Sequence, residues 1–199
     1  VYGILLSTLL GFFLGWANSK IVGRVCRNMD RKRTTKAFRW AQVASGAGVA
    51  FMHGAQDGQK FMSIFVLAIT LATGVGQADQ MVLPIWLMFF CALNMGIGTA
   101  VGGERIIKSV GLDMVKLEPF QGFAASAATF FCLMLSTFAG LPVSTTHTNT
   151  TAIMGVGAAK RKSAVKWGIA VDMVKTWVLT FPGCGLLGFA FAHLFLFFS

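Results

Sequence analysis

The sequence FMHGAQDGQK, residues 51–60, places a histidine, a carboxylate, a lysine and two glutamine amides between two apolar segments. Ionisable residues inside a membrane are costly, so they usually line a pathway or a binding site. Gly54 and Gly58 can break the helix and free backbone N–H and C=O groups for a ligand. The alternative is a short polar loop between two helices. A second polar island at 142–151, also between apolar stretches, favours the binding-site interpretation.

The composition indicates a polytopic helical membrane protein. Of the 199 residues, 55% are hydrophobic and only 12% are charged, whereas soluble domains carry about 25% charged residues. The net charge is +10, and the basic residues crowd into the segments between apolar stretches. This pattern favours the positive-inside bias of cytoplasmic loops over nucleic-acid binding, so the expected partner is a lipid bilayer. The four cysteines form no C-x-x-C pair and indicate neither a disulfide framework nor a zinc site.

Three parts are predicted along the chain. Residues 1–17 form a transmembrane helix, and residues 18–39 form a basic cytoplasmic loop with eight Lys or Arg against one Asp. Residues 40–199 form a transmembrane transport region with two polar motif breaks, at 53–60 and 142–151. The chain begins at Val1 in apolar sequence, without an initiator Met or a signal peptide, which predicts a fragment or a trimmed chain.

Two breaks in the transport region are open to alternative topologies. Residues 40–76 form either one interrupted crossing or a re-entrant hairpin, because each arm beside the first island is short for a separate crossing. Basic loops flank 120–159, and a re-entrant hairpin with its tip at 142–147 follows if both loops are cytoplasmic. Further membrane spans are expected at 83–103 and 167–198, with a turn at 77–80 and an interruption near Pro182. Asn94 and its neighbouring glycines predict close helix packing. Residues 104–118 are expected to form an amphipathic interfacial segment.

The second island reads LPVSTTHTNTT, residues 141–151. Pro142 disfavours helix before it and suits the first turn of a new helix. Backbone N–H groups near Ser144, Thr145 and Thr146 then lie at the positive end of a helix dipole, which makes an anion site fringed with hydroxyl groups. Hydroxyl groups further along the island are expected to bond back to carbonyls in the preceding turn: Thr148, Thr150 and Thr151.

The carboxylate of Asp57 would repel an anion unless another charge or proton offsets the repulsion. A bound cation could neutralise the anion, or a protonated phosphate could donate a hydrogen bond to the carboxylate. Freed carbonyls together with carboxylate and amide oxygens would make a hard-cation site, and Gln56 and Gln59 can present either end of their amides. Lys60 is either a counter-ion for Asp57 or a lysine that snorkels to the interface.

Two histidines, His53 and His147, are possible proton carriers near neutral pH. A hydrogen-bonded packing role is an equally open interpretation for both. An intramembrane enzyme acting on lipid phosphates would use Ser144 or His147 as its nucleophile. No Asp or Glu accompanies His147 locally and no cluster of arginines lies beside the island, so this enzyme interpretation is disfavoured.

Both islands resemble the motifs of one family. HGAQDGQK at His53–Lys60 resembles the HGANDGQK signature of the inorganic phosphate transporter (PiT) family, and LPVSTTHT at Leu141–Thr148 resembles its PVSTTH motif. The resemblance continues through 152–157 and 177–182 and covers nearly the whole chain. It implies an all-α, polytopic helical membrane protein with broken or re-entrant helices, built as one half of an inverted-repeat transporter. This chain would be the C-terminal half.

The resemblance also implies roles for particular residues. Those expected to bind phosphate are Asp57, Gln59, Ser144, Thr145 and Thr146. Those expected to bind the coupling ion are Asp57, Gln56 and Thr146. No catalytic residue, no cofactor and no metal beyond a transported Na⁺ is implied. Gln56 stands where the signature has Asn, one methylene shorter, which alters the expected geometry of the ion ligands.

The implied function is secondary transport of inorganic phosphate in symport with Na⁺ or H⁺, by a multi-pass protein of the plasma (inner) membrane. The expected partner is an N-terminal half of the transporter or a second copy of this chain. The sequence is also compatible with a sulfate permease of the same family and with an accessory subunit that binds no substrate. The coupling ion, the choice between phosphate and sulfate, and the oligomeric state stay open at this point.

Overall fold

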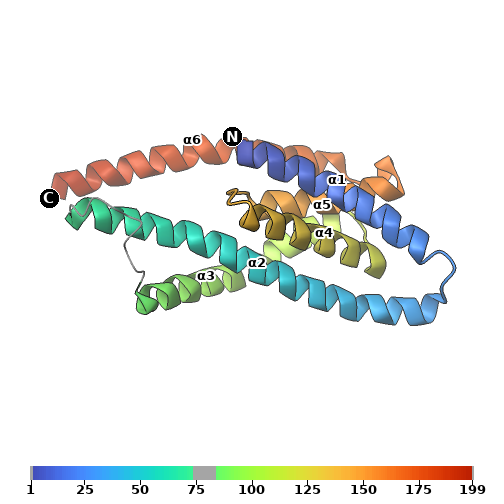
Figure 1. Cartoon of the computed structure of the whole chain (residues 1–199). Coiled ribbons are helices and arrows are strands. Elements are labelled where there is room, and N and C mark those ends of the chain that lie inside the picture. The colour runs from blue at the N-terminus through green and yellow to red at the C-terminus, as the bar shows by residue number, and fades with distance from the viewer. Residues whose placement is uncertain (1, 74–83, 199) are drawn as a thin grey trace. The chain divides into compact units, whose positions relative to one another are not determined.

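The computed structural model describes residues 2–73 and 84–198, and these residues are almost entirely helical (Figure 1). The elements in chain order are α1 Tyr2–Val25, α2 Arg31–Thr73, α3 Ile85–Ile106, the π-helix η2 Ile107–Met114, α4 Pro119–Phe138, α5 Thr145–Lys160, the 3₁₀ turn η3 Lys162–Ala164 and α6 Trp167–Phe198. The chain divides into two units, one ending at Val165 and one beginning at Lys166. The turn expected at 77–80 lies outside the described residues.

Within the described ranges, four helical segments are long and apolar enough to cross a membrane: Gly3–Val25, Ile85–Glu104, Pro119–Phe138 and Trp167–Phe197. This confirms the expectation of an all-α, polytopic membrane protein. The 43-residue helix α2 is too polar to belong to that group. At 1.5 Å per residue it is about 65 Å long, roughly twice the thickness of the hydrocarbon core.

The segment 18–39 is not an irregular loop. Helix α1 continues to Val25 and α2 begins at Arg31, so only residues 26–30 connect them. Lysine and arginine are good helix formers, and a helix that leaves the apolar layer can continue into the polar surroundings. The cytoplasmic location of this basic segment stays a prediction.

Helix α2 runs without interruption through 53–60, so the break expected at the first island is wrong. Each glycine inside a helix costs roughly 1 kcal/mol relative to alanine, and the packing of α2 against α4 supports the helix. Helix α6 likewise continues past Pro182, where an interruption was expected. Proline is tolerated in membrane helices because neighbouring groups satisfy the backbone atoms that it leaves unpaired.

The helical structure is interrupted between α4 and α5, at 139–144, so only the first three residues of the break predicted at 142–151 are non-helical and 145–151 belong to α5. Gly140 adopts φ 65°, a left-handed conformation that suits glycine at a helix C-terminus. The backbone N–H groups of Gly140 and Leu141 donate to the carbonyls of Thr137 (3.1 Å) and Ser136 (2.9 Å), which ends α4 in a Schellman motif. Helix α5 begins at Thr145, so Pro142 precedes the new helix and does not lie in its first turn.

Helices α4 and α5 form a helical hairpin with its tip at 139–144. Val115, before α4, forms an antiparallel β-bridge with Val165, after α5. The exposed side chains of Lys160 and Glu118 also form an ion pair of 2.7 Å at this base. The chain therefore enters and leaves the hairpin at the same end. The re-entrant topology in the membrane stays a prediction.

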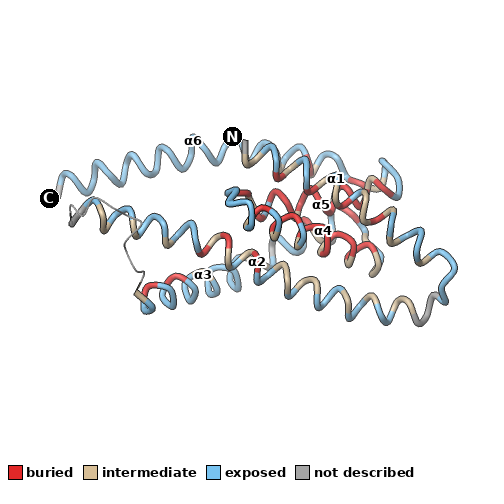
Figure 2. The backbone as a smooth tube through the Cα atoms, viewed as in Figure 1, coloured by how far each residue is buried: buried red, intermediate tan, exposed pale blue. Residues whose placement is uncertain are grey.

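The hairpin packs between α1 and α2 (Figure 1), with α5 against α1 and α4 against α2. The backbones of α1 and α5 approach closely, since an added Cβ at Gly15 would meet the backbone of Ala152 and one at Gly155 would meet the backbone of Phe12. Small residues permit such close approach of membrane helices. The buried positions gather on α4 and α5, whereas α3 and α6 are mostly exposed (Figure 2).

Candidate functional site

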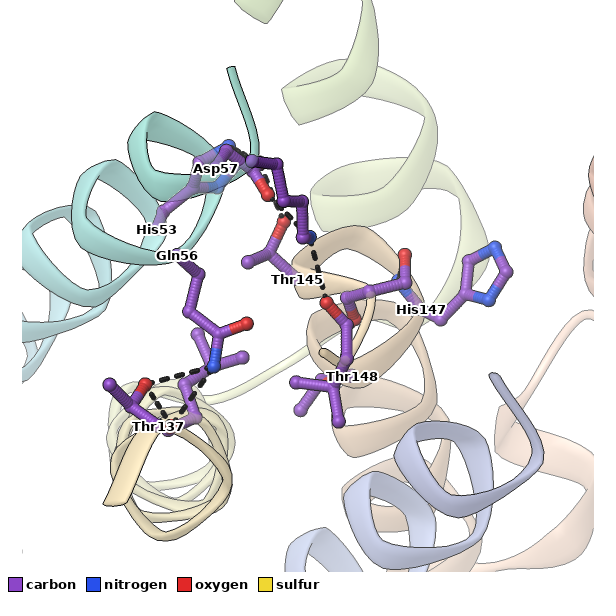
Figure 3. A network of polar contacts seen from close by, with 11 residues as sticks. His53, Gln56, Asp57, Thr137, Thr145, His147 and Thr148 are labelled. Atoms are coloured by element: carbon purple, nitrogen blue, oxygen red, sulfur yellow. Dashed lines mark hydrogen bonds and ion pairs between the residues drawn. The ribbon is translucent and has the colours of Figure 1, made fainter. Parts of the chain in front are cut away.

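The two polar islands meet at the carboxylate of Asp57. The hydroxyl group of Thr145 donates a hydrogen bond to Asp57 Oδ2 over 3.2 Å, although the two residues are 88 positions apart in the sequence. His53 Nε2 lies 3.0 Å from the same oxygen, and Lys60 Nζ lies 2.8 Å from Oδ1. Figure 3 shows Asp57 of α2 beside Thr145 at the start of α5. The Asp57 carboxylate thus contacts two basic groups of α2 and one hydroxyl group of α5.

Lys60 makes a second contact across this junction. Its ammonium group donates to the backbone carbonyl of Val143 over 2.9 Å, in the non-helical tip before α5. These contacts favour the interpretation of Lys60 as the counter-ion of Asp57 over that of a snorkelling lysine.

Helix periodicity places the three ionisable residues of the first island on a common face. His53 and Asp57 are four residues apart, and Asp57 and Lys60 are three apart, so their side chains are neighbours on the surface of a continuous helix. Buried Met52 sets the rotation of this helix by packing with Leu133 and Val143. An unbroken α2 therefore presents the ionisable groups to the hairpin tip at fixed spacing.

Gln56 ties α2 to α4. Its side chain is buried, and Nε2 donates to the hydroxyl group of Thr137 over 2.9 Å and to the carbonyl of Leu133 over 3.3 Å. Both acceptors lie on the last turns of α4, just before the hairpin tip. The amide of Gln56 thus holds the tip against the helix that carries Asp57.

Replacing Gln56 by leucine is expected to lower the free energy of unfolding by about 1–3 kcal/mol, because the two hydrogen bonds that join α2 to the hydroxyl group of Thr137 and the carbonyl of Leu133 are lost. Chemical denaturation in detergent measures the change. Gln59→Leu is the matched control, since Gln59 is an exposed amide on the same helix and its replacement is expected to change stability by less than about 0.5 kcal/mol. An equal decrease in the free energy of unfolding in the two variants would contradict the role of Gln56 in joining α2 to α4.

The start of α5 follows the expected hydrogen-bond pattern. The Ser144 hydroxyl oxygen accepts the backbone N–H of His147 over 3.4 Å, as an N-cap residue does. Thr148 and Thr151 donate to the carbonyls of Ser144 and His147 over 2.9 and 2.7 Å, which confirms the prediction for these two hydroxyl groups. Thr146 is exposed at the first turn of the helix.

The two histidines differ in their placement. His53 contacts Asp57, whereas the imidazole ring of His147 points away from Asp57 in Figure 3 and is buried on α5. The structure therefore brings together His53, Asp57 and Thr145 from the candidate residues. It holds Gln56 in the interface with α4, and it leaves His147 outside the cluster.

Two cavities adjoin the Asp57 cluster. One, of about 410 Å³, is lined by His53 and Asp57 and by Asn94 and Thr99 of α3. The other, of about 210 Å³, is lined by Gln56, Gln59, Lys60, Ser63, Thr137 and the tip residues Gly140–Pro142. Asn94 was expected to serve helix packing, and its place beside Asp57 was not predicted. The available signal was a lone amide inside an apolar span, which marks a pathway in membrane proteins.

The described residues hold no group of three or more His, Cys, Asp or Glu side chains that could bind a metal ion. Asp57 has one histidine beside it, and its other neighbours are a lysine and a hydroxyl group.

Four candidate membrane-spanning helices in the described part of the chain, together with a partly exposed ionic cluster on α2 beside a hairpin tip, are the features of a multi-pass membrane protein with a polar site. The chain belongs to the phosphate transporter family, whose family model matches residues 5–188. Membership in this family confirms the resemblance carried by the two motifs. It also sets aside the lipid-phosphate enzyme, because the family consists of transporters.

Individual relatives agree with this assignment. The chain is 37% identical over 188 residues to a probable low-affinity inorganic phosphate transporter of Bacillus subtilis (strain 168), covering 94% of this chain and 56% of that protein. It is 27% identical over 168 residues to the sodium-dependent phosphate transporter 1-B of Xenopus laevis, covering 84% and 24%. The chain thus spans about half the length, or less, of these curated relatives.

A solved structure, described as the sodium-dependent phosphate transporter, shares the fold. The TM-score is 0.66 at 21% sequence identity, and the match covers 89% of this chain and 53% of that one. The agreement in fold extends over most of this chain and about half of the solved structure.

Proposed function

We propose that this chain provides half of the substrate site of a secondary transporter that carries inorganic phosphate across the plasma membrane in symport with Na⁺ or H⁺. The observation that carries the proposal is the contact between Asp57 and Thr145, which joins the two family motifs at one point. The names of the relatives support phosphate as the substrate.

The start of α5 is suited to hold the anion. Ser144, Thr145 and Thr146 offer hydroxyl donors beside the N-terminus of a 16-residue helix, where N–H groups and the helix dipole favour negative charge. Gln59, in the cavity next to the tip, is the proposed amide donor. These residues are proposed to bind phosphate.

Asp57 is proposed to serve the coupling ion and the substrate together. Its carboxylate can accept a hydrogen bond from a protonated phosphate, and it can balance a cation in company with the oxygens of Gln56 and Thr146. His53, at 3.0 Å from Asp57, is the better placed of the two proposed proton carriers. Sulfate carries no proton at neutral pH, so a carboxylate at the site favours phosphate.

One half-site surrounds an oxyanion only in part. Its donors come from α2 and from one helix start, whereas a tetrahedral anion can accept hydrogen bonds from all sides. A second half with its own Asp and Ser-Thr-Thr copies would complete the site near the middle of the bilayer. We therefore propose pairing with an N-terminal half of the transporter or with a second copy of this chain.

Uptake of radiolabelled phosphate into reconstituted vesicles tests the function. Imposed Na⁺ and proton gradients are varied independently, and unlabelled sulfate is added as a competitor. Phosphate accumulation driven by one gradient and resistant to sulfate is the expected result. Accumulation of sulfate in place of phosphate would overturn the assignment of the substrate.

The substitutions Ser144→Ala, Thr145→Val and Thr146→Val are each expected to raise the Kd for phosphate about tenfold or more. A hydrogen bond to a charged group contributes about 1.5–3 kcal/mol. His147→Ala is expected to have a smaller effect, unless protons are the coupling ion. Equilibrium phosphate binding measures the changes, and Thr180→Val on exposed α6 is the control. Wild-type affinity in all three hydroxyl variants would place the anion elsewhere.

A further inference from the structure

The ammonium group of Lys60 lies between two oxygen atoms of different elements. Asp57 Oδ1 on α2 is 2.8 Å away, and the backbone carbonyl oxygen of Val143 at the hairpin tip is 2.9 Å away. A carboxylate oxygen next to a carbonyl from an interrupted helix is the type of donor set that binds hard cations. A covalently attached cation thus occupies a place where a free cation would find ligands.

The other carboxylate oxygen of Asp57 is also engaged. His53 Nε2 and the hydroxyl group of Thr145 both lie within hydrogen-bonding distance of Oδ2. A free alkali cation could therefore reach the Asp57 and Val143 oxygens only by moving the Lys60 ammonium group aside.

Displacement of the Lys60 side chain is sterically possible. Its side chain is 43% exposed, compared with 23% for Asp57, and it lines the cavity of about 210 Å³ beside the hairpin tip. Lysine is a compact charge on a flexible four-carbon stem. The ammonium group can thus leave the two oxygens by rotation of its own stem, while Asp57 and the hairpin tip stay in place.

We propose that Lys60 determines the ion specificity of this half-site: its ammonium group is a tethered cation between Asp57 and Val143, and an alkali cation binds there only by displacing it. With Lys60 in place, the charge of Asp57 is balanced without an added ion, so phosphate can approach in the absence of Na⁺. The inference rests on the proposed function for the role of the site, but its test does not require phosphate transport.

The test is binding of ²²Na⁺ to the purified protein in the absence of phosphate. Lys60→Met and Lys60→Gln remove the ammonium group, and each variant is expected to bind Na⁺ at least about tenfold more tightly than the wild type. In the wild type, Na⁺ must first break the charge-assisted hydrogen bonds of the ammonium group, and a change in Kd of about tenfold corresponds to the strength of one such bond. Adding Asp57→Asn to Lys60→Met is expected to abolish the gain.

Lys175→Met is the matched control. Lys175 pairs with Asp172 at the same three-residue spacing over 3.1 Å, and this pair is 72% and 73% exposed. Na⁺ binding by the Lys175→Met variant is expected to equal that of the wild type. An equal gain in Lys175→Met, or no gain in either Lys60 variant with an intact thermal unfolding transition, would overturn the proposal.

A measurement on the unmutated protein decides the matter even if both Lys60 variants fail to fold. The rate at which an amine-reactive reagent labels Lys60, read by mass spectrometry, is expected to rise when NaCl replaces choline chloride at constant ionic strength. A labelling rate independent of Na⁺ would overturn the displacement. Failure of wild-type phosphate uptake would refute the proposed transport function. The Na⁺-binding and labelling measurements would still test the role of Lys60, because they do not depend on phosphate.

Discussion

Replacing Asp57 by asparagine is expected to reduce coupled phosphate uptake by about a hundredfold or more while membrane insertion stays intact. The carboxylate accepts bonds from Lys60, His53 and Thr145. Loss of two contacts at about 1.5 kcal/mol each already corresponds to a factor of about a hundred. Asparagine keeps the shape of the side chain but removes the charge that holds the two islands together. Radiolabelled phosphate uptake into vesicles measures the effect.

Asp172→Asn is the control for this substitution. Asp172 forms an exposed pair with Lys175 on α6 at the spacing found in the Asp57–Lys60 pair. Exposed ion pairs contribute about 0–1 kcal/mol, so uptake by Asp172→Asn is expected to match the wild type. Normal uptake with unchanged cation dependence in Asp57→Asn would rule out the assigned role of the carboxylate.

Gly155→Val is expected to destabilise the protein by about 3 kcal/mol or more. A Cβ at Gly155 would overlap the backbone carbonyl of Phe12 and lie 2.9 Å from the backbone nitrogen of Trp16. Overpacking of a core costs about 1–3 kcal/mol even where side chains can adjust, and here the neighbouring atoms belong to the backbone of α1. Thermal and chemical unfolding in detergent measure the loss.

Phosphate binding is expected to fall in the same variant, because α5 carries Ser144 and Thr145 at its start and would shift away from α1. Gly46→Val is the matched control, since a Cβ at Gly46 on α2 meets no atom within 4 Å among those described. Its stability is expected to change by less than about 0.5 kcal/mol. Equal destabilisation of the two variants would mean that the helix contact does not limit the size of residue 155.

The amino-acid sequence by itself determined the class of protein and that the helix is interrupted near Pro142. Apolar stretches of about 20 residues indicate membrane helices because the bilayer core has that thickness. The segment around Pro142 predicts a local interruption, and Gly140 and Ser144 supply the end of α4 and the cap of α5. The family motifs also indicated Asp57 and Thr145, which the fold brings into contact. These features depend on local backbone chemistry or on short patterns.

Only the tertiary structure decided the state of the first island. Gly54 and Gly58 allow either a break or a helix, and the choice depends on whether neighbouring elements support the helix. Buried Met52 and Gln56 pack against α4 and the hairpin tip, so α2 remains continuous. A difference of roughly 1 kcal/mol per glycine is small beside such contacts.

The partners of Lys60 and Asn94 also come from the tertiary structure. Lys60 reaches the carbonyl of Val143, 83 residues away, and Asn94 of α3 shares a cavity with Asp57. A backbone carbonyl has the same chemistry at every residue, so no sequence pattern marks the one that a distant lysine will contact. The packing of α2 against the hairpin and α3 selects these partners, because it decides which groups lie within hydrogen-bonding distance.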